Sequence, residues 1–145
     1  MLVQQILSSK PNQNIETISS SLSVSDAASI LSSKRIGALI VSDDSGQTVA
    51  GMISERDIVR ELGKRGTGCL HDAVAELMTK KIVTCSKNET VDAVLRTMTD
   101  GRFRHLPVME NGKLIGLISI GDAVQARLSE MTMENQALEG MIKGF

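Results

Sequence analysis

The sequence contains almost no aromatic residues: Phe103 and Phe145 are the only two, and Trp and Tyr are absent. Proteins that bind single-stranded nucleic acids on RRM or OB folds stack the bases on aromatic side chains. Two phenylalanines cannot form such a surface, so this class of function is excluded. The 145 residues are enough for one compact domain, or for two small halves that share a core.

The chain also lacks an excess of one charge and a long hydrophobic run. Sixteen Lys and Arg residues against seventeen Asp and Glu residues give a net charge of −1, whereas proteins that bind phosphate backbones or anionic membranes are usually basic. No apolar run approaches the roughly 20 residues that span a bilayer, and the N-terminus does not resemble a signal peptide. We therefore expect a cytoplasmic protein that binds neither nucleic acid nor membrane.

Cysteine is scarce, and the spacing of Cys69 and Cys85 matches neither a CxxC redox pair nor a zinc ligand set. A nucleophilic cysteine would need a base, an orienting group and a cleft, and His71 near Cys69 does not make such a set. No Walker loop or GxGxxG motif is present. We expect two free thiols, no metal site and no catalytic residues, and hence a protein that is not an enzyme.

The sequence contains an internal repeat. Three pairs of segments align in the same order: 15–24 with 82–91, 38–41 with 105–108, and 51–59 with 116–124. Equivalent residues are 67 positions apart up to a turn that is two residues longer in the first copy. After this turn they are 65 positions apart. Between the first two segments, both copies place apolar residues at i, i+3, i+4 and i+7, which is typical of an amphipathic helix. Each copy therefore predicts a strand, a helix, two further strands and a second helix.

Turns and glycines set the boundaries of these elements. Asp44-Ser45-Gly46 and Asn111-Gly112 predict hairpin turns, because Gly and Asn accept a positive φ. Gly63, Gly66 and Gly68 are expected to stop a helix and to start a linker near residues 66–73. We divide the chain into two repeats and a helical tail: 1–68, 69–128 and 129–145. The predicted fold class is α/β (α+β), with three-stranded sheets that bury their apolar faces against each other.

Both repeats carry Gly, Ser and Asp in a G-x-x-S-x-x-D pattern at the end of a strand: Gly51, Ser54 and Asp57, and Gly116, Ser119 and Asp122. One interpretation is a helix-capping box, and Ser23 and Asp26 have the same spacing before another helix. The other is a nucleoside site. A carboxylate can accept both hydrogen bonds of a ribose diol, an open helix N-terminus favours phosphate, and glycine allows close approach to the backbone.

The doubled unit, with GMISERD in the first copy and FRHLPV before GLISIGD in the second, resembles a tandem pair of CBS domains, or Bateman module. The resemblance covers residues of roughly 1 to 128. It implies β-α-β-β-α repeats packed sheet to sheet with pseudo-twofold symmetry, and two clefts that bind AMP, ADP, ATP, NAD(H) or S-adenosylmethionine derivatives. It also implies that Asp holds the ribose, with Ser and Thr beside it. On this chain these residues are Asp57, Ser54 and Thr17, and Asp122, Ser119 and Thr84.

The two copies differ in their basic residues. In the first copy Arg56 precedes Asp57, whereas the second copy has a glycine at the equivalent position. Conversely, the second copy has Arg104 and His105 where the first copy has Gly37 and Ala38. Arg102 has a counterpart in Arg35. Arginine is a natural partner of phosphate oxygens, so we predict two clefts of unequal phosphate affinity. The alternatives are solvated surface charges and, for His105, a strand residue that faces solvent. Candidates for an apolar adenine pocket are Ile15, Ile36, Met52, Val83 and Leu117, although such residues are usually core.

The C-terminal region shows a heptad pattern formed by Val124, Leu128, Met131, Asn135, Leu138 and Ile142. Asn135 falls at an a position, where a buried Asn favours a two-stranded parallel coiled coil. We therefore predict a homodimer, with packing of this helix on its own or its partner's domain as the alternative.

The sequence as a whole predicts a regulatory module without catalytic activity that binds an adenine nucleotide, with AMP and NAD(H) favoured, and signals to an unknown effector protein. The first alternative is a structural homodimeric scaffold with vestigial clefts. The others are a polyanion-binding protein using Lys34, Arg35, Arg102 and Arg104, and an enzyme acting on a bound nucleotide.

Overall fold

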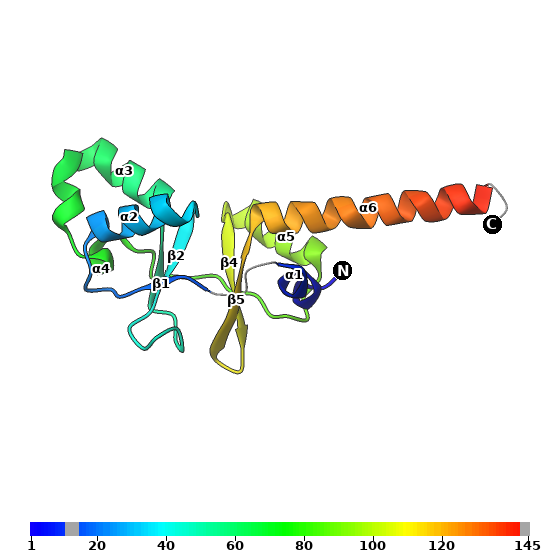
Figure 1. The fold of residues 1–145 in the computed structure, drawn as a ribbon, viewed down its shortest axis with the longest axis horizontal. Coiled ribbons are helices and arrows are strands. Elements are labelled where there is room, and N and C mark those ends of the chain that lie inside the picture. Colours follow the sequence, from blue (N-terminus) through cyan, green and yellow to red (C-terminus); the bar gives the residue numbers. More distant parts are fainter. Residues whose placement is uncertain (11–14, 143–145) are drawn as a thin grey trace. The chain divides into compact units, whose positions relative to one another are not determined.

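The protein is described here by a computed structural model that covers residues 1–10 and 15–142. It divides into two compact units (Figure 1). The first-repeat unit comprises Asn14–Val83 with Asn111–Leu114, and the second-repeat unit comprises Met1–Gln13, Thr84–Glu110 and Ile115–Phe145. Each unit contains most of the helices and strands of one sequence repeat.

The first-repeat unit has a three-stranded sheet in the order β1-β2-β3. Its elements are β1 (Thr17–Ile18), α2 (Val24–Lys34), β2 (Ala38–Val41), β3 (Gly51–Ser54), α3 (Glu55–Arg65), the 3-10 helix η1 (Gly66–His71) and α4 (Val74–Leu77). Strand β2 pairs in parallel with β1 and antiparallel with β3. Leu39, Val41 and Ile53 project from one face of this sheet into a core that includes Val24, Ala27 and Leu31 of α2. The predicted amphipathic helix is therefore confirmed as α2.

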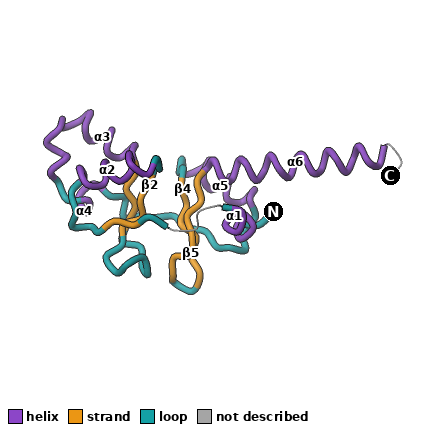
Figure 2. The backbone as a smooth tube through the Cα atoms, in the orientation of Figure 1, coloured by secondary structure: helices purple, strands orange, loops and turns teal. Residues whose placement is uncertain are grey.

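The second-repeat unit repeats this plan with a smaller sheet. Its elements are α1 (Val3–Ser9), α5 (Val91–Gly101), β4 (His105–Glu110), β5 (Lys113–Ser119) and α6 (Ile120–Ile142). Asn111 and Gly112 join β4 to β5 with φ values of 52° and 78°, so the predicted hairpin turn is confirmed (Figure 2). Ser45 and Gly46 of the first repeat also have positive φ, as expected.

The prediction of three strands in both sheets is wrong for the second repeat, where β4 and β5 form a two-stranded sheet. Cys85 contributes a single parallel bridge to Val108 instead of a strand. Proline explains the difference. In the first repeat the N–H of Ile40 donates to the carbonyl of Glu16 over 3.4 Å. The counterpart of Ile40 is Pro107, which has no N–H and cannot make this bond.

The expected linker is also different. Helix α3 continues through Gly63 to Arg65, and Gly66, with φ of 73°, is the residue that ends it. Residues 66–71 then form η1, and Cys69 within it is completely buried. Glycine at position 63 lowers helix propensity without preventing helix formation, whereas the positive φ of Gly66 is incompatible with a continued helix.

The segment that precedes each repeat in the sequence belongs to the unit of the other repeat. Helix α1, which precedes the first repeat in sequence, lies in the second-repeat unit, and η1 and α4 lie in the first-repeat unit. The division into 1–68, 69–128 and 129–145 is kept as a proposal about the sequence repeats, and residues 143–145 of the tail lie outside the described residues.

Both cysteines are free, as the sequence predicted, and both are buried. Burial raises the pKa of the Cys85 thiol to about 12, with a further contribution from the negative charge of Glu89. Cys85 packs in the core of the second-repeat unit, which is consistent with a structural rather than a chemical role.

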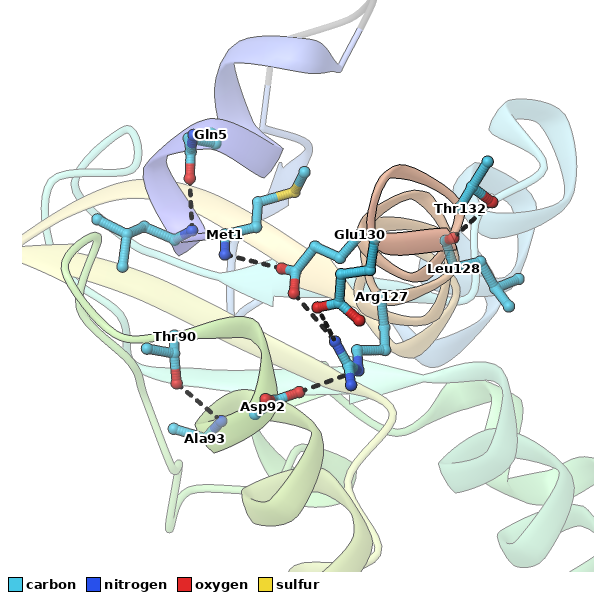
Figure 3. A network of polar contacts seen from close by, with 11 residues as sticks. Met1, Gln5, Thr90, Asp92, Ala93, Arg127, Leu128, Glu130 and Thr132 are labelled. Atoms are coloured by element: carbon cyan, nitrogen blue, oxygen red, sulfur yellow. Dashed lines mark hydrogen bonds and ion pairs between the residues drawn. The ribbon is translucent and has the colours of Figure 1, made fainter. Parts of the chain in front are cut away.

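Helix α6 is attached to its own unit through its N-terminal half (Figure 3). Arg127 forms ion pairs with Asp92 of α5 at 3.4 Å and with Glu130 at 3.1 Å, and Glu130 is 2.8 Å from the N-terminal ammonium of Met1. From Met131 to Glu139 every residue of the helix is exposed. Within residues 1–10 and 15–142, no helix is long and apolar enough to cross a membrane.

Candidate functional site

The Ser and Asp residues of the repeated motif form the same capping box in both units. In the first, Asp57 Oδ2 accepts hydrogen bonds from the Ser54 backbone N–H at 2.9 Å and from the Ser54 hydroxyl at 3.0 Å, and the N–H of Asp57 donates to Ser54 Oγ at 3.2 Å. In the second, the Ser119 N–H donates to Asp122 Oδ2 at 2.9 Å, and the Asp122 N–H donates to Ser119 Oγ at 3.0 Å. Both pairs lie where a strand runs directly into a helix.

The capping interpretation therefore accounts for the local geometry of both motifs, and Ser23 and Asp26 make the same pair of bonds. Burial distinguishes the three boxes. Asp26 is exposed, whereas the side chain of Asp57 is only 14% exposed and that of Asp122 only 27%. A carboxylate that is partly removed from water forms stronger hydrogen bonds to a ligand than an exposed one.

The sheet register places Thr17 on the same face as the capping serine. Thr17 is in register with Ile40, and Ile40 with Met52. Because side chains alternate along a strand, Met52 and Ser54 project from one face of β3, opposite to the core residue Ile53. Thr17, Met52 and Ser54 consequently share the sheet face that does not carry the unit's core.

The second-repeat unit has the same arrangement. Leu106, Val108, Ile118 and Cys85 belong to the core cluster. By alternation, His105, Leu117 and Ser119 project from the opposite face. Thr84 is exposed and precedes Cys85 outside any strand, so alternation does not assign it to a face. In each unit, the capping serine therefore lines the face away from the core, and the Asp of the capping box lies at its edge.

The five apolar candidates do not form one group. Met52 and Leu117 are half-buried on the faces just described, whereas Ile36 packs against the core of its own unit. Ile15 is half-buried next to β1, and Val83 is 37% exposed and belongs to the first-repeat unit. Met52 and Leu117 are therefore the candidates that best fit an adenine-contacting role.

The candidate basic residues are exposed or half-buried. Arg56 in the first turn of α3 and Arg104 just before β4 are exposed, and His105 is half-buried. Arg102 ends α5 in the left-handed conformation with φ of 58°, and Arg35 ends α2 in the same way with φ of 55°. A non-glycine residue in this conformation is strained, and such strain often accompanies a functional role.

The expected role of the two motif glycines is wrong. What approaches the Gly51 backbone is the α4 segment of the same unit: a Cβ at this position would lie 2.7 Å from Met78 Sδ and 2.9 Å from the carbonyl oxygen of Thr79. At Gly116, a Cβ would lie 2.5 Å from Leu7 Cδ2 of α1. Both glycines are therefore explained by close packing of another segment of the same unit, which is α1 at Gly116 and the residues that follow α4 at Gly51.

Substituting Gly51 by alanine should consequently destabilise the protein by about 1–3 kcal/mol, because the backbone carbonyl of Thr79 cannot move aside easily. Gly63→Ala is the matched control. A Cβ at Gly63 meets nothing within 4 Å, and alanine in a helix is favoured, so this change should stabilise the fold by about 0.5–1 kcal/mol. Urea unfolding followed by circular dichroism measures both, and equal effects would contradict this explanation.

Lys10 contacts the capping box of the second repeat, which the sequence analysis did not predict. Its Nζ donates to Asp122 Oδ2 at 3.0 Å and to the carbonyl oxygen of Leu117 at 2.8 Å. Burial by itself raises the pKa of Asp122, but hydrogen bonds from the Ser119 backbone and from Lys10 outweigh it, and the net shift is downward. Asp122 is therefore held in its charged form.

Among the residues that the structure describes, no group of three or more His, Cys, Asp or Glu side chains is arranged to hold a metal ion. Each capping box presents groups that form hydrogen bonds and carry charge: a carboxylate, a hydroxyl and a helix N-terminus. Such groups can bind a polar ligand that carries hydroxyl groups and a phosphate.

Comparison with known proteins identifies the family. The sequence profile described as "CBS domain" matches twice, at residues 3–64 and 74–129. The chain belongs to the CBS-domain family. The resemblance to a tandem CBS pair is thus confirmed, as is the α+β fold class.

Solved and curated CBS proteins support this assignment. The CBS-domain protein ATU1752 from Agrobacterium tumefaciens is 42% identical, with a TM-score of 0.83 over 88% of this chain and 99% of that one. The CBS pair of MJ0100, solved in complex with 5′-methylthioadenosine and S-adenosyl-L-methionine, is 27% identical, with a TM-score of 0.76 over 90% of this chain and 98% of that one. The mitochondrial protein CBSX3 of Arabidopsis thaliana is 36% identical over 83% of this chain, which spans 60% of the relative's length.

Proposed function

We propose that this CBS pair binds adenine nucleotides, one site in each repeat, and acts as a regulatory module without catalytic activity. The observation that carries the proposal is the duplicated carboxylate. Asp57 and Asp122 occupy equivalent positions, are partly buried, and lie at the edge of a sheet face that presents Ser and a half-buried apolar side chain, with Thr17 on the same face in the first repeat. The adenosine ligands in the MJ0100 complex support this class of ligand.

Different residues would contact the ribose and the base of the ligand. The carboxylate of Asp57 or Asp122 would accept hydrogen bonds from the ribose hydroxyls, beside Ser54 and Thr17 or Ser119 and Thr84. Met52 and Leu117 would contact the base. With no Trp or Tyr in the chain, recognition would depend on hydrogen bonds and aliphatic contacts more than on stacking.

The exposed arginines favour a ligand with a phosphate over the positively charged sulfonium of S-adenosylmethionine. In this proposal Arg56 would add a positive charge at the first site, and Arg102, Arg104 and His105 would do so at the second. We therefore favour AMP and NAD(H), with ADP, ATP and S-adenosylmethionine as further candidates, and we expect the two sites to differ in affinity.

The output of such a module would be a partner protein or a change in its own assembly. The exposed apolar residues of α6, among them Leu128 at 54% and Leu138 at 56% exposure, support a homodimer formed through this helix. We keep the cytoplasm as the proposed location, although the A. thaliana relative carries a mitochondrial name.

A thermal-shift panel tests the function. AMP, ADP, ATP, NAD⁺, NADH, S-adenosylmethionine and adenosine are each added at millimolar concentration to the purified protein. At least one phosphate-containing ligand should raise the Tm, because binding only to the native state stabilises it. The near absence of absorbance at 280 nm also makes a co-purified nucleotide visible near 260 nm. A Tm unchanged by every ligand would contradict the proposal.

A structural homodimer is the second candidate, because the hydrogen bonds within each capping box fully account for Ser54, Asp57, Ser119 and Asp122 without a ligand. In that case the panel gives no shift while the protein still dimerises.

A further inference from the structure

Helices α1 and α4 are equivalent segments, although neither belongs to the aligned part of the repeats. Both have the pattern V-x-x-(I/L)-(L/M)-x-x-K, at an offset of 71: Val3, Ile6, Leu7 and Lys10 correspond to Val74, Leu77, Met78 and Lys81. Leu7 packs against Gly116, and Met78 packs against Gly51, which are themselves equivalent.

The two segments also dock on their units through the same backbone bonds. In the second-repeat unit, the N–H of Val3 donates to Glu89 O at 2.9 Å and that of Gln4 to Lys87 O at 3.0 Å. In the first-repeat unit, the N–H of Val74 donates to Leu22 O at 2.7 Å and that of Ala75 to Ser20 O at 3.0 Å. Lys10 and Lys81 therefore correspond in the sequence, although Lys10 directly follows α1 and Lys81 lies four residues beyond the end of α4.

The two lysines nevertheless have different partners. Lys10 binds Asp122 and the Leu117 carbonyl, and its side chain is 31% exposed. Lys81 is exposed, and among the described residues the cation that pairs with Asp57 is instead Arg60, at 3.5 Å from Oδ1. The carboxylate of the second repeat is thus neutralised by an internal lysine, and that of the first repeat by a more exposed arginine of its own helix.

This contact competes with a ligand. Asp122 Oδ2 accepts one hydrogen bond from the Ser119 N–H and one from Lys10, which together use the two lone pairs of this oxygen. If two ligand hydroxyls are to bind both oxygens of the Asp122 carboxylate, they must displace the Lys10 ammonium. The ion pair with Lys10 therefore has to break before Asp122 can accept them.

Building on the proposed nucleotide site, we propose that Lys10 is an internal competitor at the second repeat: it occupies Asp122 in the free protein, lowers the affinity of that site, and is released when a nucleoside binds. At Asp57 the corresponding hydrogen bond to Oδ2 comes from the Ser54 hydroxyl, which can rotate away, and the cation that pairs with this carboxylate is the exposed Arg60 rather than Lys81. The unequal sites then follow from Lys10 as well as from the arginines. Release of Lys10 also removes a contact that holds the C-terminal end of α1, so occupancy of this site is linked to that segment.

Isothermal titration calorimetry of Asp57→Asn tests this, because only the second site remains for the ligand. Adding Lys10→Met keeps the aliphatic stem but removes the charge, and should tighten adenosine binding by about fivefold, the range expected for a partly exposed ion pair. Lys10→Arg keeps the positive charge and the hydrogen-bond donors and should therefore not tighten adenosine binding. The matched control is Lys81→Met on Asp122→Asn, which should leave adenosine affinity at the first site unchanged.

Amine labelling followed by mass spectrometry gives an independent result. Lys10 should react more slowly than Lys81 in the free protein, and AMP should accelerate labelling of Lys10.

An adenosine affinity that Lys10→Met leaves unchanged or weakens would overturn the inference. Weaker AMP binding with unchanged adenosine binding would make Lys10 a phosphate ligand instead. If the wild type binds no nucleoside at either site, the proposed function fails as well. If it binds at the first site but Lys10→Met has no effect, only this inference fails.

Discussion

The double variant Asp57→Asn/Asp122→Asn should lose nucleotide affinity by about 100-fold or more at both sites. Each asparagine keeps the size of the side chain and an oxygen that can accept the N–H of the capping serine. It removes the negative charge that strengthens hydrogen bonds to a ribose diol. Hydrogen bonds to charged groups contribute about 1.5–3 kcal/mol each, and about 1.4 kcal/mol corresponds to a tenfold change in affinity.

The third capping box supplies the control for this variant. Asp26→Asn makes the same change at an exposed box that has the same two hydrogen bonds. All three positions should lose up to about 1 kcal/mol of stability through the weaker cap and helix-dipole interaction, and Asp57 and Asp122 additionally lose their ion pairs with Arg60 and Lys10. Only Asp57 and Asp122 should affect nucleotide binding, measured by calorimetry. Undiminished affinity in the double variant would contradict the site assignment.

A second large effect is expected at the C-terminal helix. Met131→Glu/Leu138→Glu should convert a dimer into a monomer, because two charges per chain are placed in the apolar seam of α6. Burying one such apolar side chain stabilises an interface by about 1.5–3 kcal/mol. Four buried side chains lost per dimer should therefore raise the dissociation constant by at least about 1000-fold. Sedimentation equilibrium over a range of concentrations measures it.

Met133→Glu is the matched control for this experiment. Met133 is 55% exposed, similar to Leu138, but lies at an f position of the heptad, on the side of the helix away from the seam. It should leave the dissociation constant unchanged. Equal effects of Met133→Glu and of the seam substitutions would show that α6 does not pair through its heptads, and a monomeric wild type would exclude the dimer altogether.

Much of the fold followed from local patterns. The helical stripe of α2 and the Asn111-Gly112 turn depend on periodicity and on allowed φ values, which are properties of short segments. The missing strand of the second repeat could also have been predicted. Pro107 stands in the HLPV segment, and a proline within a strand removes a ladder bond, but the equivalence of the repeats suggested a strand in both.

The helix formed by residues 66–71 was harder to predict. Three glycines within six residues usually indicate an open linker. The segment is ordered because Cys69 and the half-buried Leu70 pack inward, with Leu70 against the core of the first-repeat unit. Burial of these side chains is a tertiary effect that overrides local propensity, and the sequence pattern alone contains no sign of it.

At the candidate site, too, part of the arrangement followed from the sequence and part only from the tertiary structure. The repeated G-x-x-S-x-x-D pattern indicated which serines and aspartates are equivalent, and the structure places both pairs at strand ends with the same hydrogen bonds. The role expected for the glycines was wrong, because the segments that contact them, around Met78 and Leu7, are distant in sequence. The binding roles of these residues stay predictions that the Asp57 and Asp122 variants test.

The sequence by itself determined the repeat, the order of elements within it and the equivalence of its polar residues, because these depend on spacing along the chain. Only the tertiary structure revealed that α1 packs on the second repeat, that Gly51 and Gly116 are covered by helices, and that Lys10 reaches Asp122. Lys10 and Asp122 are separated by most of the chain, and no local pattern can encode such a contact. The backbone bonds that dock α1 bring Lys10 near Asp122, and the partly buried carboxylate then favours an ion pair.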